Sequence, residues 1–143
     1  MCSDPDFLDE EQSEVFSKAK EYIFGNFFSF NMTEEYASEH TPEEFAETFA
    51  DALEYNYALK LVNEYYTDEN GALKAYSADR AGNLTHMGYC YEPVYLSDSE
   101  AAFKKIITCC DYYENPYFVW FEEVNYHMVK TENGWRMDRF NTW

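Results

Sequence analysis

The feature that most constrains this chain is a change in its hydrophobic period at Gly71. Before Gly71, apolar side chains recur every three or four residues, as on one face of a helix, whereas after it they alternate with polar ones, as in strands. Such an order of segments is typical of an α+β protein. We therefore predict N-terminal helices packed on a curved antiparallel β-sheet, in a single domain over residues 1–143.

Two helix starts stand out in the first half. Asp9 begins the first, with Gln12 three residues on as in a capping box. Thr41 begins the second, where Glu44 completes the same pattern. The periodic pattern of this second segment weakens at residues 54–56, so it forms two helices or one broken helix. We expect two or three helices in all.

The second half predicts a sheet of four to six strands. Strands are expected at residues 73–77, 85–96, 103–113, 117–130 and 135–143. Pro93 indicates an edge strand or a bulge. Asn133 and Gly134 form the strongest hairpin signal and predict a tight turn before the last strand.

The last strand carries a parity conflict. Met137 and Phe140 would point to opposite sheet faces in a regular strand, although both are large and apolar. A bulge near Asp138 and Arg139 would turn both side chains inward. We predict that bulge, and that Trp135 joins them in the core.

The long strand of residues 117–130 has apolar side chains on both faces. Trp120 and Tyr126 share one face, and Phe121 and His127 share the other. One face is expected to pack on the helices, and the other to be partly covered, curved or a ligand surface. Trp120 and Tyr126 are candidate binding residues, because aromatic side chains with polar tips suit binding surfaces.

No motif identifies a catalytic activity. The chain lacks a phosphate-binding glycine loop, a nucleophile elbow and a zinc-binding helix motif. His127 would be a general base only beside a carboxylate such as Glu123 or Asp138, and a structural strand histidine is the alternative. Glu122 and Glu123 alternate to opposite faces, so they do not form one acid–base site. We expect no catalytic residue, no cofactor and no metal site, hence no enzyme.

The charge is strongly acidic and uneven. The net charge is −18, with 18 acidic and 3 basic residues in positions 1–70 and 10 acidic and 7 basic in positions 71–143. This field repels phosphates, so nucleic acid is not an expected partner. It favours a partner protein with a basic surface, or a small ligand. Glu43, Glu44 and Glu47 are candidate contacts, and solubility alone is the alternative explanation.

A polar turn over residues 79–83 is a further candidate. Asp79, Arg80 and Asn83 place a carboxylate, a fixed cation and an amide together between two strands. Arg80 could hold a carboxylate through two hydrogen bonds. An internal pair between Asp79 and Arg80, with no ligand, is the structural alternative.

The cysteines and the N-terminus leave the location open. Cys2, Cys90, Cys109 and Cys110 contain no Cys-x-x-Cys pair, and we interpret them mainly as small buried side chains, with disulfides left open. Met1 followed at once by Cys2 is typical of a lipoprotein whose signal was replaced by a start codon, and an ordinary cytoplasmic start fits equally. No stretch approaches the ~20 apolar residues of a membrane span.

Four segments carry a family resemblance. They are the helix start at residues 8–12, the segments at 68–73 and 79–82, and the closing segment at 129–140, which contains Gly134-Trp135-Arg136. Together they resemble IseA-type inhibitors of cell-wall DL-endopeptidases. The order of elements is similar to the nuclear-transport-factor-two-like, or cystatin-like, superfamily. The resemblance implies a cystatin-like cone of helices and sheet and an inhibitory role.

These observations favour a non-enzymatic binding or inhibitor module, drawn by its acidic half to a hydrolase with a basic rim. A small-molecule pocket or an isomerase-like enzyme on the concave sheet is the first alternative. An acidic mimic of nucleic acid is the second.

Overall fold

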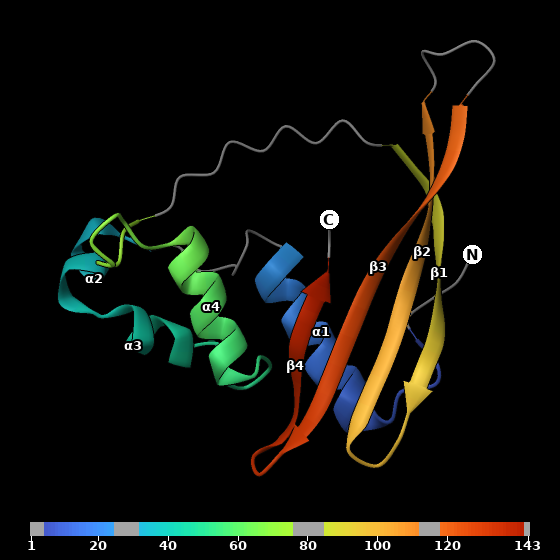
Figure 1. The fold of residues 1–143 in the computed structure, drawn as a ribbon, viewed down its shortest axis with the longest axis horizontal. Coiled ribbons are helices and arrows are strands. Elements are labelled where there is room, and N and C mark those ends of the chain that lie inside the picture. The colour runs from blue at the N-terminus through green and yellow to red at the C-terminus, as the bar shows by residue number, and fades with distance from the viewer. Residues whose placement is uncertain (1–4, 25–31, 76–84, 112–117, 142–143) are drawn as a thin grey trace.

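The computed structural model describes residues 5–24, 32–75, 85–111 and 118–141. Within them, helices come first and an antiparallel sheet follows, so the α+β class is confirmed (Figure 1). In chain order the elements are α1 (Glu10–Phe24), α2 (Glu34–Glu39), α3 (Pro42–Glu47), α4 (Tyr55–Tyr65), β1 (Thr85–Leu96), β2 (Glu100–Asp111), β3 (Phe118–Thr131) and β4 (Gly134–Asn141).

The strands form a simple meander. Their spatial order is β1-β2-β3-β4, and each neighbouring pair is antiparallel. Ser97 closes the turn between β1 and β2, where its N–H donates to Glu100 O at 2.9 Å. β1 is an edge strand with a register shift between Pro93 and Tyr95, as the proline predicted. β2 begins at Glu100, earlier than expected.

The predicted hairpin between the last two strands is confirmed. Thr131 pairs with Gly134, so the two turn residues are Glu132 and Asn133, one position earlier than an Asn-Gly turn would place them. Gly134 follows the turn with φ 108°, a conformation that side chains with a Cβ rarely adopt. The Thr131 hydroxyl donates to Gly134 O at 2.8 Å and fixes the turn.

The predicted bulge in β4 is also confirmed. Met128 pairs with Met137, but His127 pairs with Arg139, so Asp138 is the extra residue. This insertion resolves the parity conflict, because Met137 and Phe140 are both buried. Trp135 is buried with them, as expected.

The core lies between α1 and one face of the sheet. Phe16 of α1 contacts Phe103, Tyr126 and Phe140, with ring centroids 5.0, 5.1 and 6.4 Å apart. Figure 1 shows α1 crossing the sheet while α2, α3 and α4 lie beside the β4 edge. The opposite sheet face leaves Val119 and Phe121 exposed. One face is therefore packed on a helix, as the sequence predicted.

The second helical segment forms two helices, one of the two arrangements expected, but the first of them ends earlier than its apolar pattern predicts. α3 ends at Glu47, and the chain then turns until α4 begins at Tyr55. Leu53 forms a parallel bridge with Met137 of β4, and Met137 N donates to Ala52 O at 2.8 Å. The outer edge of β4 thus pairs with the backbone of Ala52 and Leu53, two residues that the apolar pattern places in a helix.

Two further expectations were wrong in detail. α2 was not expected, so the described residues contain four helices rather than two or three. Thr33 caps α2 by accepting a hydrogen bond from Tyr36 N at 3.1 Å. The short strand at 73–77 is reduced to a bridge between Leu73 and Thr67, and residues 76 and 77 lie outside the described residues. None of the described helices is long and apolar enough to cross a membrane.

Candidate binding surface

The most charged part of the described structure is α2 and α3. Six exposed glutamates lie on these two short helices and are called the acidic helix cluster: Glu34, Glu35, Glu39, Glu43, Glu44 and Glu47. The sequence has no Lys or Arg between Lys20 and Lys60. Within the described ranges, none of the six carboxylates forms an ion pair. Their charge is therefore presented to solvent without a neutralising side chain.

The local sequence explains why these helices form. Each has a threonine N-cap and two acidic residues in its first turn, which the positive end of a helix stabilises. Thr41 accepts a hydrogen bond from Glu44 N at 3.2 Å, as its predicted cap requires. Glu43, Glu44 and Glu47 are exposed.

Aromatic contacts join the two helices. Tyr36 of α2 stacks on His40 with ring centroids 3.8 Å apart and meets Phe45 of α3 at 6.1 Å. Burial raises the pKa of Tyr36, and the nearby Glu44 carboxylate adds to the shift. The acidic helix cluster is thus one structural unit.

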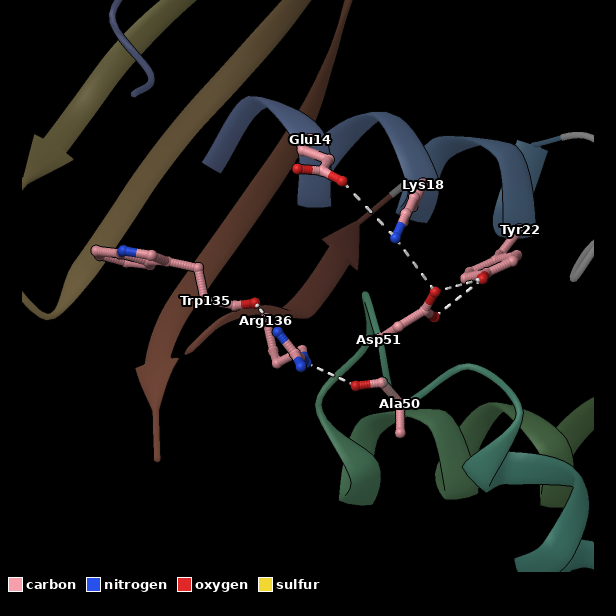
Figure 2. A network of polar contacts seen from close by, with 7 residues as sticks. All are labelled: Glu14, Lys18, Tyr22, Ala50, Asp51, Trp135 and Arg136. Atoms are coloured by element: carbon pink, nitrogen blue, oxygen red, sulfur yellow. Dashed lines mark hydrogen bonds and ion pairs between the residues drawn. The ribbon is translucent and has the colours of Figure 1, made fainter. Parts of the chain in front are cut away.

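A polar network ties the segment after α3 to α1 and β4 (Figure 2). Lys18 Nζ lies 3.9 Å from Glu14 Oε1 and 3.5 Å from Asp51 Oδ2. Tyr22 Oη donates to Asp51, with oxygen distances of 2.9 and 3.0 Å. Burial and then this hydrogen bond raise the pKa of Tyr22 to about 12, so the hydroxyl keeps its proton.

Arg136 of β4 also holds the segment that follows α3. Arg136 Nε donates to Ala50 O at 2.6 Å, and Arg136 Nη1 donates to Trp135 O at 2.7 Å (Figure 2). Ala50 and Asp51 are therefore fixed from two sides. This anchors the end of α3 and limits how far the acidic helix cluster can move relative to the sheet.

His127 has the carboxylate neighbour that a general base would need. Its Nδ1 lies 2.6 Å from Asp138 Oδ1, and its Nε2 lies 3.5 Å from Glu100 Oε1. Glu123 instead meets Lys104, with Oε1 and Nζ 3.1 Å apart. Both ring nitrogens of His127 therefore face carboxylates, and neither faces a Ser or Cys side chain in the described structure. This arrangement fits the structural alternative.

The two aromatic candidates occupy different environments on the helix-facing side. Trp120 is half-buried, and its Nε1 donates to Glu122 Oε1 at 3.1 Å. Glu122 and Glu123 thus contact different groups, as their alternation predicted. Tyr126 is only 2% exposed, and its hydroxyl has no hydrogen-bond partner among the described atoms. Burial raises the pKa of Tyr126 well above its ordinary value.

Several candidates cannot be placed. Asp79, Arg80, Asn83 and Cys2 lie outside the described residues. Cys109 and Cys110 are buried, and burial followed by the Glu122 carboxylate raises the pKa of the Cys109 thiol. That shift suits a small packing residue rather than a nucleophile. Across the part of the chain that the structure describes, no group of His, Cys, Asp or Glu has the arrangement of a metal site.

Comparisons with known proteins identify no relative. No protein-family model, no curated protein and no solved structure matches this chain. The assignment of function therefore depends on the residues themselves.

The sequence interpretation missed part of this surface. The three glutamates of α2 were not named, although Thr33 followed by Glu34 and Glu35 is a cap with an acidic first turn. The Arg136 contact to Ala50 had no local signal, because it joins segments far apart in the chain.

Proposed function

We propose that this protein is a non-enzymatic binding module whose partner is a protein with a basic surface. The observation that carries the proposal is the acidic helix cluster, six exposed carboxylates with no ion pair in the described ranges. Carboxylates held close together repel one another, and a partner's Lys and Arg side chains relieve that repulsion. Such a field also accelerates encounter with a basic partner.

The finer proposal is that the partner is a cell-wall hydrolase with a basic rim around its active site. The resemblance of residues 8–12, 68–73, 79–82 and 129–140 to IseA-type inhibitors supports this choice. The anchoring of Ala50 and Asp51 supports it as well, because a fixed cluster loses little conformational entropy on binding.

The environment of His127 supports a non-catalytic function for the protein. A base must offer a ring nitrogen to its substrate, and both nitrogens of His127 face Asp138 or Glu100. The Cys109 thiol is buried, with a raised pKa, so it is a poor nucleophile.

A small-molecule site is the second candidate, and one observation favours it. The Tyr126 hydroxyl is buried without a described partner, and an unpaired buried hydroxyl costs about 1–3 kcal/mol. A ligand that reached the Tyr126 hydroxyl would relieve that cost.

The test uses a purified cell-wall DL-endopeptidase with a basic rim. The protein is titrated into the enzyme, and hydrolysis of a peptidoglycan peptide is measured together with binding by calorimetry. We expect the hydrolysis rate to fall as the protein binds, and both the binding and the inhibition to weaken as salt rises. Binding that salt leaves unchanged would contradict a charge-driven contact. Competition by duplex DNA for the same partner would instead identify a nucleic-acid mimic.

A further inference from the structure

Two neighbouring lysines of β2 have opposite environments. Lys104 lies on the open face of the sheet, where its Nζ is 3.1 Å from Glu123 Oε1. Lys105 lies on the helix-facing side, as the buried Phe103 does, and is itself half-buried. It forms no ion pair and no hydrogen bond in the described structure. Lys105 is therefore a cation whose donors lack an acceptor, in a chain of net charge −18.

The surroundings of Lys105 favour an anion. Its Nζ lies 4.4 Å from the centre of the Tyr89 ring and 5.9 Å from that of the Tyr91 ring. Burial lowers the pKa of Lys105, and the charge of Lys20 on α1 adds to the shift. Two like charges repel, and an anion beside Lys105 relieves that repulsion. Glu122 is the acidic residue of β3 on this side, and its Oε1 instead accepts from an indole N–H at 3.1 Å.

A second donor without an acceptor lies diagonally across from Lys105. Tyr126 of β3 pairs with Phe103 of β2. Lys105, two residues further along β2, is therefore a diagonal neighbour of Tyr126 on the same face, about 7–8 Å away. The Tyr126 hydroxyl is buried and has no hydrogen-bond partner among the described atoms. The Tyr126 ring lies 6.3 Å from the Tyr91 ring, so Lys105 and Tyr126 flank Tyr91.

Tyr91 controls access to the second donor. The Tyr91 hydroxyl is close enough to Tyr126 to add to the raised pKa of that residue. Tyr91 is half-buried and belongs to β1, and no described strand lies beyond β1. A ring at this edge can swing outward without displacing a neighbouring strand. A ligand that turns Tyr91 outward therefore reaches the buried Tyr126 hydroxyl.

We propose that this place binds a small aromatic carboxylate. The carboxylate accepts hydrogen bonds from Lys105 Nζ and Tyr126 Oη, two donors that have no acceptor in the described structure. The aromatic body of the ligand lies against Tyr89, which is 38% exposed and so offers its ring for stacking. The inference rests on the small-molecule candidate above and gives its chemical class. It is independent of the acidic helix cluster and of a partner protein.

The test is a titration of the full chain with benzoate at constant ionic strength, followed by amide chemical shifts in nuclear magnetic resonance. We expect saturable shifts at Lys105 and Tyr126, with a dissociation constant of ~1 mM, which suits so small a ligand. Benzamide is the neutral analogue and offers Lys105 no charge. It should bind at least about tenfold more weakly than benzoate.

Three variants locate the contact. Lys105→Met removes a charge-assisted hydrogen bond and should raise the dissociation constant of benzoate by about tenfold or more. Lys104→Met is the matched control, because Lys104 is adjacent in the chain but lies on the opposite face, and it should change the constant less than about twofold. Tyr126→Phe should raise the constant about fivefold. It should not lower the free energy of unfolding without benzoate, because the hydroxyl that it removes has no described partner.

Four results would overturn the proposal. One is the absence of saturable shifts up to ~20 mM benzoate, and if benzamide also fails to bind, the small-molecule candidate fails with it. Another is benzamide binding as tightly as benzoate, which would leave a small-molecule site but no preference for an anion. The third is equal weakening by Lys104→Met and Lys105→Met, which would reduce the effect to overall charge. The last is normal benzoate binding by Tyr126→Phe. Circular dichroism of each variant checks its fold.

Discussion

His127 and Asp138 face each other across β3 and β4, with Nδ1 and Oδ1 2.6 Å apart. Met137 faces the core, so the next residue, Asp138, lies on the opposite sheet face, which His127 also occupies. An ionised carboxylate only accepts hydrogen bonds, so a hydrogen bond in this pair requires Nδ1 of His127 to be the donor. The pair therefore lies at the β4 bulge, on the sheet face opposite the buried Met137 and Phe140.

Removing the Asp138 carboxylate should destabilise the fold. Asp138→Ala removes a charge-assisted hydrogen bond that is partly buried, and we expect a loss of about 1 kcal/mol in the free energy of unfolding by urea. Glu100→Ala is the control, because Glu100 Oε1 lies 3.5 Å from His127 and forms a weaker contact. It should cost only a few tenths of a kcal/mol. Equal losses of unfolding free energy in the two variants would show that the short contact to Asp138 stabilises the fold no more than the longer contact to Glu100 does.

The hairpin glycine should be difficult to replace. Gly134 has φ 108°, and a Cβ added there would lie 2.6 Å from Glu11 Oε1. Glu11 can rotate away, so the backbone conformation dominates, and Gly134→Ala should cost about 1–3 kcal/mol. Gly88→Ala, with ordinary φ and open space around it, should change stability by less than about 0.5 kcal/mol. Thermal unfolding of both variants measures the difference, and similar stabilities would refute the turn geometry.

Tyr57 gives the fold a dependence on high pH. Burial raises the pKa of Tyr57 to about 12, from an ordinary value of 10.0. Its hydroxyl accepts from Phe140 N at 3.0 Å and lies 3.4 Å from Phe140 O, which joins α4 to β4. The unfolded chain loses this proton first as pH rises, so the contribution of Tyr57 is complete below pH 10 and is lost toward pH 12.

The Tyr57→Phe variant tests this linkage. It removes the contact to Phe140, so it should cost about 1 kcal/mol at neutral pH. It should also lose stability less steeply than the wild type between pH 10 and pH 12. Urea unfolding at a series of pH values measures both effects. If the unfolding free energy of the variant depended on pH in the same way as that of the wild type, the pKa of Tyr57 would not differ between the folded and unfolded chains.

Local chemistry was enough to predict most of the sheet. Strand parity, Pro93 and the residues around Gly134 are readable within a few positions, so the hairpins, the edge strand and the β4 bulge were predicted. The early end of α3 was not predicted, because the bridge between Leu53 and Met137 joins segments far apart in the chain and overrides helix propensity.

The candidate site was predicted only in part. Glu43, Glu44 and Glu47 are exposed on α3 as expected, because charged side chains remain in water. Glu123 and Asp138 were named as examples of a carboxylate that His127 would need nearby, and the pairing of β3 with β4 brings Asp138 to it. The position of Tyr126 diagonally across from Lys105 depends on strand pairing, which no local pattern encodes.

The polar turn of residues 79–83 remains a separate prediction. If this turn supplies specificity, Arg80→Ala should weaken binding to the endopeptidase chiefly by faster dissociation, because a cation that holds a carboxylate by two hydrogen bonds acts after encounter. Surface plasmon resonance separates the two rates. A normal dissociation rate in the variant would exclude Arg80 from the contact.

The acidic helix cluster is tested most directly by the association rate with the purified endopeptidase, measured by stopped flow at low and physiological salt. The variant Glu43→Gln, Glu44→Gln, Glu47→Gln removes three charges from α3, and its control replaces the exposed Asp98, Glu123 and Glu132 by their amides. We predict that the α3 variant associates several-fold more slowly at low salt, with little change in dissociation, and that the control associates nearly as fast as the wild type. Equal slowing in both variants, or none in either, would contradict binding through the acidic helix cluster.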